Sequence, residues 1–199
     1  GDANDYLPLA GTVTIAAGAT TAEIVVFVQN DLLVEPAETV IVTLAAVTDG
    51  DPDITIDDLN GTATLSIGDD DAATVSVAKV ADGTEAATPA PGKFRVTQTQ
   101  ASAVDTVLSY TVSGTATAGD GNDFTPLSGT VTVAAGSLTA DIDVAVLDDD
   151  LVEGTETVSV TLTAITSVSP DVSINTAGRT ATLDVLDDDA ASVSLARVN

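Results

Sequence analysis

The sequence lacks several residue types, and each absence narrows its possible function. There is no cysteine, so no disulfide staples the loops and some other device must tie them. There is no histidine either, so the usual ligands of zinc and copper are missing. Only five residues are basic against 31 acidic ones, which gives a formal net charge of −26. Such a chain is repelled by nucleic acid and by anionic membrane surfaces.

Aromatic residues make up only 3% of the sequence, and tryptophan and methionine are absent. No transmembrane run and no signal peptide is visible, and direct membrane insertion is not expected. The chain begins inside a repeating pattern, so we expect a piece of something longer. The 44% hydrophobic content, with abundant Val, Thr, Ala and Leu, predicts a β-rich protein with a core of branched aliphatic side chains.

The sequence repeats itself after 118 residues. Residues 1–80 align with residues 119–198 without a gap, and 46 of these 80 positions are identical. A period this long is one domain, so the repeat predicts a tandem array. We predict a partial unit at 1–71 that lacks its first strands, a complete unit at 72–189, and the first strand of a following unit at 190–199.

Short, alternating apolar segments separated by Gly, Pro, Asn and Asp predict the strands. Within the complete unit, Val158, Val160 and Leu162 point one way and the polar residues between them point the other. No window shows extended helical periodicity. The fold class is therefore all-β, as tandem immunoglobulin-like seven-stranded β-sandwiches. The seven predicted strands of the complete unit lie near 73–80, 93–98, 106–113, 129–134, 140–147, 157–165 and 180–186.

Acidic residues gather where the predicted strands end. LDDDLVEGTE at 147–156 holds five carboxylates and no basic residue, QNDLLVEPAE at 29–38 repeats the pattern, and Asp triplets stand at 69–71 and 187–189. Two like charges about 4 Å apart repel by roughly 4 kcal/mol at an effective dielectric of ~20. Either these carboxylates extend into water and keep the protein soluble, or a cation lies between them.

Calcium is the cation that fits this residue set. Ca²⁺ takes about 6–8 hard oxygen ligands in tolerant geometry, whereas Mg²⁺ keeps more of its waters and uses fewer protein ligands. The acids recur at strand ends, while the basic residues stand mostly elsewhere. The sequence therefore favours calcium sites over a purely solvating role.

The order of GDGNDF, SGTVTVAAG, VLDDDLVEGTETVSVTL and ATLDVLDDD resembles the Calx-β repeat. That family is known from sodium–calcium exchangers, an integrin cytoplasmic region and large bacterial surface adhesins. The resemblance covers the complete unit from end to end, and the partial unit over all that it retains. It implies a seven-stranded sandwich that binds calcium with loops at one end.

The resemblance also implies which residues hold the ions. In the complete unit they are Glu85, Asp123, Asp148, Asp149, Glu153, Glu156, Asp187, Asp188 and Asp189. In the partial unit the counterparts are Asp5, Asp31, Glu35, Glu38, Asp69, Asp70 and Asp71. There Asn30 replaces an aspartate, Leu32 stands at the position of Asp150, and the counterpart of Glu85 is missing. The first site is therefore expected to bind more weakly or to bind fewer ions.

One calcium-like pattern is set aside. Asp49, Asp51 and Asp53 have the spacing that opens an EF-hand loop, but Ile54 stands at the glycine position and Asn60 at the closing glutamate position. We interpret this segment as a solvated loop.

The leading functional hypothesis is a calcium-stiffened structural repeat of an extracellular adhesin or surface stalk. Its partners would be calcium ions and neighbouring repeats, with localisation at the cell surface or outside the cell. The alternatives are a self-assembling filament or surface layer that exchanges a strand, such as 190–198, head to tail, and a calcium-sensing regulatory domain. Enzymatic activity is not expected, because the acids have no His or Cys nucleophile and no aromatic sugar platform.

Overall fold

The computed structural model describes residues 5–119, 121–167 and 171–197. Regular structure in these residues is entirely β, and they contain no helix that could cross a bilayer. The strands are β1 (Glu38–Thr43), β2 (Thr62–Ile67), β3 (Ala73–Ala81), β4 (Gly83–Thr84), β5 (Gly92–Gln98), β6 (Thr106–Gly114), β7 (Thr130–Val133), β8 (Thr139–Val144), β9 (Glu156–Ile165), β10 (Val172–Ile174) and β11 (Thr180–Leu186).

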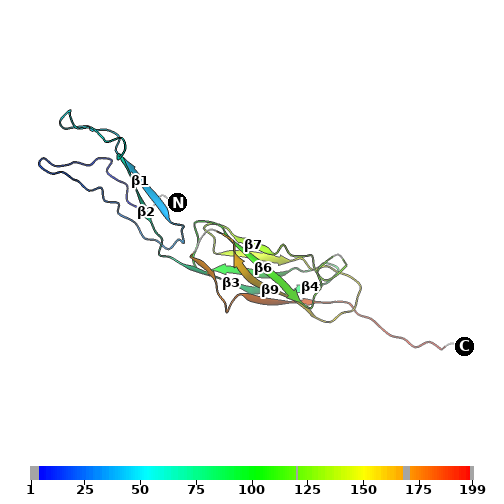
Figure 1. The fold of residues 1–199 in the computed structure, drawn as a ribbon. Coiled ribbons are helices and arrows are strands. Elements are labelled where there is room, and N and C mark those ends of the chain that lie inside the picture. Colours follow the sequence, from blue (N-terminus) through cyan, green and yellow to red (C-terminus); the bar gives the residue numbers. More distant parts are fainter. Residues whose placement is uncertain (1–4, 120, 168–170, 198–199) are drawn as a thin grey trace.

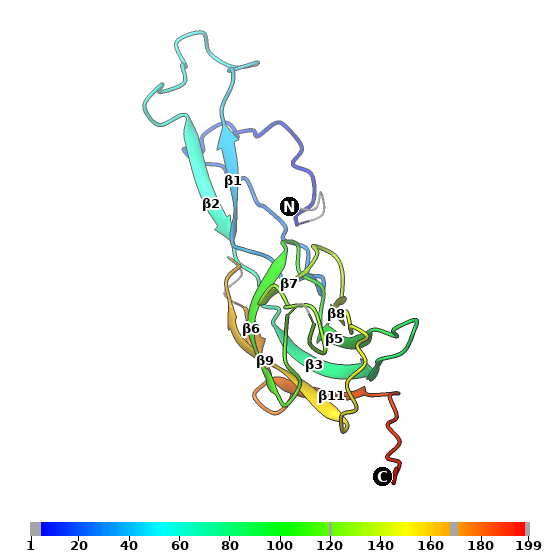
Figure 2. The ribbon, with the colours of Figure 1, turned by 90° about the vertical axis from the view of Figure 1, so that its right-hand side faces the viewer.

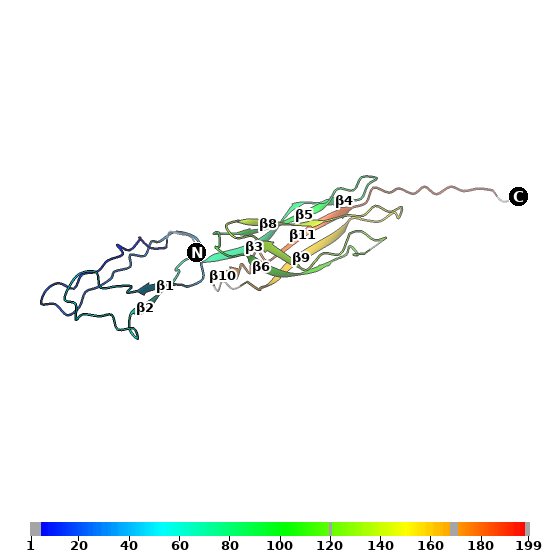
Figure 3. The same cartoon turned by 90° about the horizontal axis from the view of Figure 1, so that it is seen from above.

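The molecule is elongated, with two bodies arranged end to end (Figure 1). The first body, which we call the first unit, carries the β1–β2 ribbon, and the second is a sandwich built from β3–β11 (Figure 2). After β11 the chain leaves the far end of the sandwich as an extended tail (Figure 3). In this tail Val193 and Leu195 are fully exposed, and residues 190–197 belong to no strand.

The complete unit consists of two sheets. One has the order β10-β3-β5-β8, and the other has the order β4-β11-β9-β6-β7. All seven predicted strands are present, although β8 ends at Val144 rather than at 147. Strands β4 and β10, which are two and three residues long, were not predicted from the sequence. Such short edge strands, paired in parallel with β11 and β3, leave no alternating pattern to detect.

The core follows the alternation that the sequence predicts. Val158, Val160 and Leu162 of β9 are buried against the facing sheet, whose Phe94 and Val96 are fully buried. Burial of each large aliphatic side chain contributes about 1.5–3 kcal/mol relative to exposure. On the outer face of β9 and β11, hydroxyl groups pair across the strands, as in Ser159–Thr182 (2.7 Å) and Thr161–Thr180 (2.9 Å).

The first unit forms much less regular structure from nearly the same sequence. Strands β1 and β2 pair in the register expected from β9 and β11. Residues 12–15 and 21–26, the counterparts of β7 and β8, form no strand. In the complete unit β7 pairs with β6 and β8 with β5, and the described residues of the first unit, 5–71, include no counterpart of β5 or β6. Strand formation therefore depends on the partner strand, not on the local sequence.

The segment with EF-hand-like spacing is a turn. The Asp53 N–H donates to Asp51 Oδ1 (2.9 Å), and the Ile54 N–H donates to the Asp51 carbonyl (3.0 Å). The Asp51 carboxylate thus stabilises its own loop, and Asp49, Asp51 and Asp53 are exposed.

Candidate metal centre

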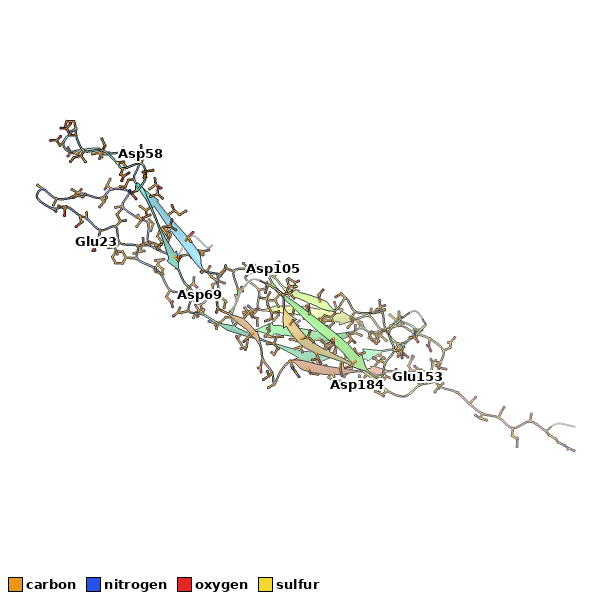
Figure 4. The ribbon with its side chains drawn as sticks, in the orientation of Figure 1. Glu23, Asp58, Asp69, Asp105, Glu153 and Asp184 are labelled. Carbon is orange, nitrogen blue, oxygen red and sulfur yellow. The ribbon has the colours of Figure 1, made fainter. Side chains whose placement is uncertain are left out.

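Four acidic segments meet at the end of the sandwich from which the tail departs. They are the loop after β4, the loop between β6 and β7, the β8–β9 loop, and the residues after β11. Figure 4 shows Glu153 at this end of the sandwich, whereas Asp69, which belongs to the first unit, lies beyond the opposite end. Loop ends meet here because β11 runs toward this end and β9 runs away from it, in an antiparallel pair.

Glu85, Asp123 and Glu153 form the inner cluster of this end. Their carboxylate oxygens all lie within 4.8 Å of one another, although the residues come from three different loops. Glu85 is 4% exposed and Asp123 is 6% exposed. Burying carboxylates together is costly unless they are protonated or paired with a cation. The cluster is therefore either protonated or occupied by a cation, and it is a candidate cation site.

Backbone contacts place Glu85 and Asp123. The Glu85 N–H donates to the Leu186 carbonyl (2.8 Å), which fixes Glu85 beside the end of β11. Two residues earlier, Gly83 packs closely against Val146, because a Cβ at position 83 would lie 2.5 Å from Val146 Cγ2. The Leu147 N–H donates to the Asp123 carbonyl (2.9 Å), which ties the Asp123 loop to the segment after β8.

A third contact joins the β8–β9 loop to the residues after β11. The Glu153 N–H donates to Asp187 Oδ2 (2.8 Å), and the Asp189 N–H donates to Asp187 Oδ1 (2.9 Å). These backbone hydrogen bonds hold the pKa of Asp187 below its usual value, with the bond from Asp189 as the largest cause. Asp187 is thus a fixed negative charge beside the inner cluster.

The other carboxyls respond to the crowding of negative charge. Burial, reinforced by the charges of Asp123, Asp149 and other neighbours, raises the pKa of Glu85 to about 7. A hydrogen bond with Asp123, together with burial, raises the pKa of Glu156 to about 7. Burial and the same neighbouring charges also raise the pKa of Glu153. Without a cation, Glu85 and Glu156 are partly protonated near neutral pH, and a bound cation would displace these protons.

An outer group of acids surrounds Asp189. Burial raises the pKa of Asp189, and the charges of Asp187, Asp188, Asp150 and Asp148 add to the effect. Asp150 was not among the ligands predicted from the sequence, although it belongs to the group of acids around Asp189. Its place in the acidic run 148–150 could have indicated this.

Basic side chains make their ion pairs elsewhere. Lys79 pairs with Asp82 (2.9 Å), and on the outer face of β5 Arg95 pairs with Asp141 (2.7 Å). Lys93 joins this second group through Asp141 and Asp143. Among the described residues, no ion pair of this kind reaches the inner cluster, so its charge is not neutralised by lysine or arginine.

The first unit places its acids around one small hollow. The hollow has a volume of about 50 Å³, room for an ion or a water, and Asp5, Asp31, Glu35, Glu38, Asp69 and Asp70 all line it. The backbone around this hollow makes the same hydrogen bond as in the complete unit. The Glu35 N–H donates to Asp69 Oδ2 (2.8 Å), as the Glu153 N–H does to Asp187 Oδ2. The remaining predicted residue, Asp71, accepts a hydrogen bond from Gln100 Nε2 (3.2 Å).

The structure thus brings the predicted acids of each unit together at one end of that unit. In the complete unit, Glu85, Asp123, Glu153 and Glu156 form direct contacts, with Asp149 and Asp187 as charged neighbours. Asp148 and Asp188 lie in the outer group. A ligand role for each of these residues stays a prediction.

The fold and this acid-lined end define a β-sandwich domain with a candidate cation site made of loops. The Calx-beta domain model matches residues 1–71 and residues 73–189, so the chain belongs to the Calx-beta domain family. The search of curated proteins gave no match.

Several solved structures are similar to part of the chain. One is a crystal structure of CBD12 from CALX1.2, with 22% identity over 58% of this chain and 44% of that chain, and a TM-score of 0.46. Another is the apo form of the Calx CBD1 domain, with 22% identity over 57% of this chain and 99% of that one, and a TM-score of 0.43. A third is CBD12 of CALX1.1, described as a calcium binding domain, with 21% identity over 57% of this chain and 44% of that one, and a TM-score of 0.44. The match thus spans less than half of each CBD12 chain.

The residues of the inner cluster suit calcium. They supply only carboxylate oxygens, the hard ligands that Ca²⁺ prefers, from loops that can tolerate variable geometry. Glu85, Asp123, Glu153 and Glu156 would hold the ion, and Asp187 would orient Glu153 through its backbone. When bound, the ion would neutralise the repulsion between the loops.

Proposed function

We propose that this chain binds calcium at the acidic end of each unit, and that the bound ions stiffen the array. The observation that carries the proposal is the convergence of Glu85, Asp123 and Glu153, of which Glu85 and Asp123 are buried. The ion pairs of lysine and arginine in the described part of the chain lie elsewhere. An acid cluster that only kept the protein soluble would have no reason to be buried.

Thermal unfolding of the full chain in excess Ca²⁺, in excess Mg²⁺ and with chelator tests calcium binding. One ion at 100 times its dissociation constant adds about 2.7 kcal/mol to the free energy of unfolding. We expect a calcium-selective rise of several degrees in the midpoint of the complete unit. Asp123→Asn should remove most of this rise, whereas Asp51→Asn, in the solvated turn, should keep it. A midpoint of thermal unfolding that does not change with calcium would contradict the proposal, and the acids would then serve only as solvated charges.

We further propose that the units act as spacers in an extracellular or cell-surface stalk of adhesin type. The end-to-end arrangement and the single residue, Ala72, between Asp71 and β3 support a stiff rod. Small-angle scattering should show a longer, narrower particle in calcium than in chelator. Antibody labelling of intact against permeabilised source cells tests the location, and labelling only after permeabilisation would refute it.

Head-to-tail self-association by strand exchange is a second candidate. Residues 190–197 repeat the sequence of β3, and Val193 and Leu195 are fully exposed although their counterparts Val75 and Val77 are buried. A donated tail would replace β3 alone, however, and in the complete unit β3 pairs with β5, which the first unit lacks. Sedimentation at rising concentration tests the idea, and a chain that stays monomeric and folded would contradict it.

A calcium-sensing regulatory role stays a third candidate. It would be distinguished from stiffening by cooperative calcium binding that changes the shape of the array.

A further inference from the structure

The joint between the two units is built around Val34. This residue belongs to the first unit, yet its side chain is fully buried in the hydrophobic core of the complete unit. Its N–H donates to the Ala101 carbonyl (2.9 Å), and its carbonyl accepts from the Ala103 N–H (2.9 Å). Val34 therefore forms a parallel bridge with Ser102 and inserts into the loop between β5 and β6.

Two carboxylates of the first unit fix the segment that carries Val34. The Glu35 N–H donates to Asp69 Oδ2 (2.8 Å), and the Asp71 N–H donates to Asp69 Oδ1 (3.2 Å). Asp71 in turn accepts from Gln100 Nε2 across the joint. The valine and this carboxylate chain together connect the two units.

The same arrangement recurs at the far end of the complete unit. Val152 is the counterpart of Val34 under the 118-residue repeat. The Glu153 N–H donates to Asp187 Oδ2 (2.8 Å), and the Asp189 N–H donates to Asp187 Oδ1 (2.9 Å). Both bonds match those of the first unit, so the same local contacts hold the segment that carries Val152.

The two valines differ in what covers them. Val34 is 0% exposed and Val152 is 50% exposed. Leu151 is exposed, whereas its counterpart Leu33 is half-buried. The 100–103 loop of the described chain is already filled by Val34, so a partner for Val152 must be a different copy of that loop.

We propose that residues 151–153, with Asp189 beside them, form a docking surface for the β5–β6 loop of a further repeat of this kind. The partner loop would supply one N–H and one carbonyl to bridge Val152, and an amide side chain at the Gln100 position to bond Asp189. Residues 190–197 repeat the segment that leads from Asp71 into β3, and so provide the matching connection. The surface adjoins the proposed calcium site, since Glu153 and Asp189 belong to both, but docking rests mainly on an apolar side chain and backbone hydrogen bonds and not on a bound ion.

Amide hydrogen exchange in the presence of calcium tests this surface. The full chain is compared with a version lengthened by a second copy of residues 72–199 placed after Asp189, so that the new junction repeats the native one. We expect the Val152 amide to exchange about tenfold more slowly in the lengthened chain than in the full chain. Its exchange in the lengthened chain should then be as slow as that of the Val34 amide, which should be protected in both proteins. Unchanged exchange at Val152 beside a protected Val34 would overturn the proposal, and so would an unprotected Val34.

Two variants of the lengthened chain separate docking from general stability. Val152→Asp should restore fast exchange at the Ala103 amide of the added copy, the donor to the inserted residue. Leu59→Asp introduces the same charge at an exposed leucine in a loop of the first unit and should leave that amide protected. Equal effects of the two substitutions would overturn the proposal. Calcium titration of the same proteins shows independently whether the calcium sites are intact.

Discussion

The two units of this chain share 46 of 80 aligned positions and yet differ sharply in burial. Val133 is 1% exposed, whereas its counterpart Ile15 is 57% exposed; Leu162 is 1% exposed, whereas Leu44 is 46% exposed. The difference does not lie in these side chains, which are equally apolar. It lies in β3, β5 and β6, which complete both sheets of one unit and have no counterpart in the other.

The comparison shows that a segment with an alternating apolar pattern forms a strand only where a partner strand is present. Backbone N–H and C=O groups of a strand need a neighbouring strand, and its apolar face needs a facing sheet. In the first unit the acidic end nevertheless keeps its form, because hydrogen bonds such as Glu35–Asp69 are local to the loops. The acidic loops therefore have the same backbone contacts in both units, whereas the cores of the two units differ.

The largest difference between the units is expected for the paired substitutions Leu162→Ala and Leu44→Ala. Leu162 is buried in the core, so its truncation should cost about 2–5 kcal/mol in the free energy of unfolding of the complete unit. Leu44→Ala should change stability by less than about 1 kcal/mol. Denaturant titration followed by unit-resolved amide exchange measures both, and equal costs would contradict the comparison.

The loss of calcium binding on removal of one predicted ligand should also differ between the units. Asp123→Asn should remove most of the roughly 2.7 kcal/mol that one ion adds at 100 times its dissociation constant. Asp5→Asn, at the counterpart position, should cost less, because the first unit lacks a residue equivalent to Glu85. Isothermal titration calorimetry of the full chain and both variants resolves the two classes of site. A greater loss of binding in the Asp5 variant would reverse the predicted order.

The valines of the joint give a smaller effect. Val34→Ala should lower the stability of the joined units by about 1–2 kcal/mol, since most of the burial of one valine is lost. Val152→Ala removes a half-exposed side chain and should cost less than about 0.5 kcal/mol in the present chain. Thermal unfolding of the two variants makes the test, with the parent chain as reference. Matching losses would show that the burial of Val34 is not stabilising.

The pH dependence of stability should also distinguish the units, with Glu85 contributing on the order of 3 kcal/mol. The pKa of Glu85 is raised from 4.5 to about 7, so the folded state holds a proton that the unfolded state has released. The resulting stability is present below about pH 4.5 and is lost as the pH rises through 7. In chelator, the midpoint of the complete unit should therefore fall between pH 5 and pH 8.

Calcium should reverse this slope, because the ion displaces the protons that Glu85 and Glu156 hold. Glu85→Gln should flatten the chelator profile, and the first unit should show a weaker slope since it has no counterpart of Glu85. A chelator profile that rises over the same range would refute the assignment.

Most of the fold and of the candidate site could be predicted from the sequence. The 118-residue repeat and the period-two alternation of segments such as 157–165 predicted the long strands, because side-chain direction in a strand depends only on position. The acids were predicted as a group because they recur at strand ends. The short strands β4 and β10 could not be predicted, since two or three residues carry no periodic signal.

The sequence by itself determined the all-β class, the repeat, the long strands of the complete unit and the chemical type of the candidate cation site. Each of these follows from local residue order and composition. Only the tertiary structure decided that Glu85 joins Asp123 and Glu153, that residues 12–26 of the first unit form no strands, and that Val34 is buried in the neighbouring unit while Val152 is exposed. These outcomes depend on which distant segments meet, and similar local sequences adopt different structures when their partner strands differ.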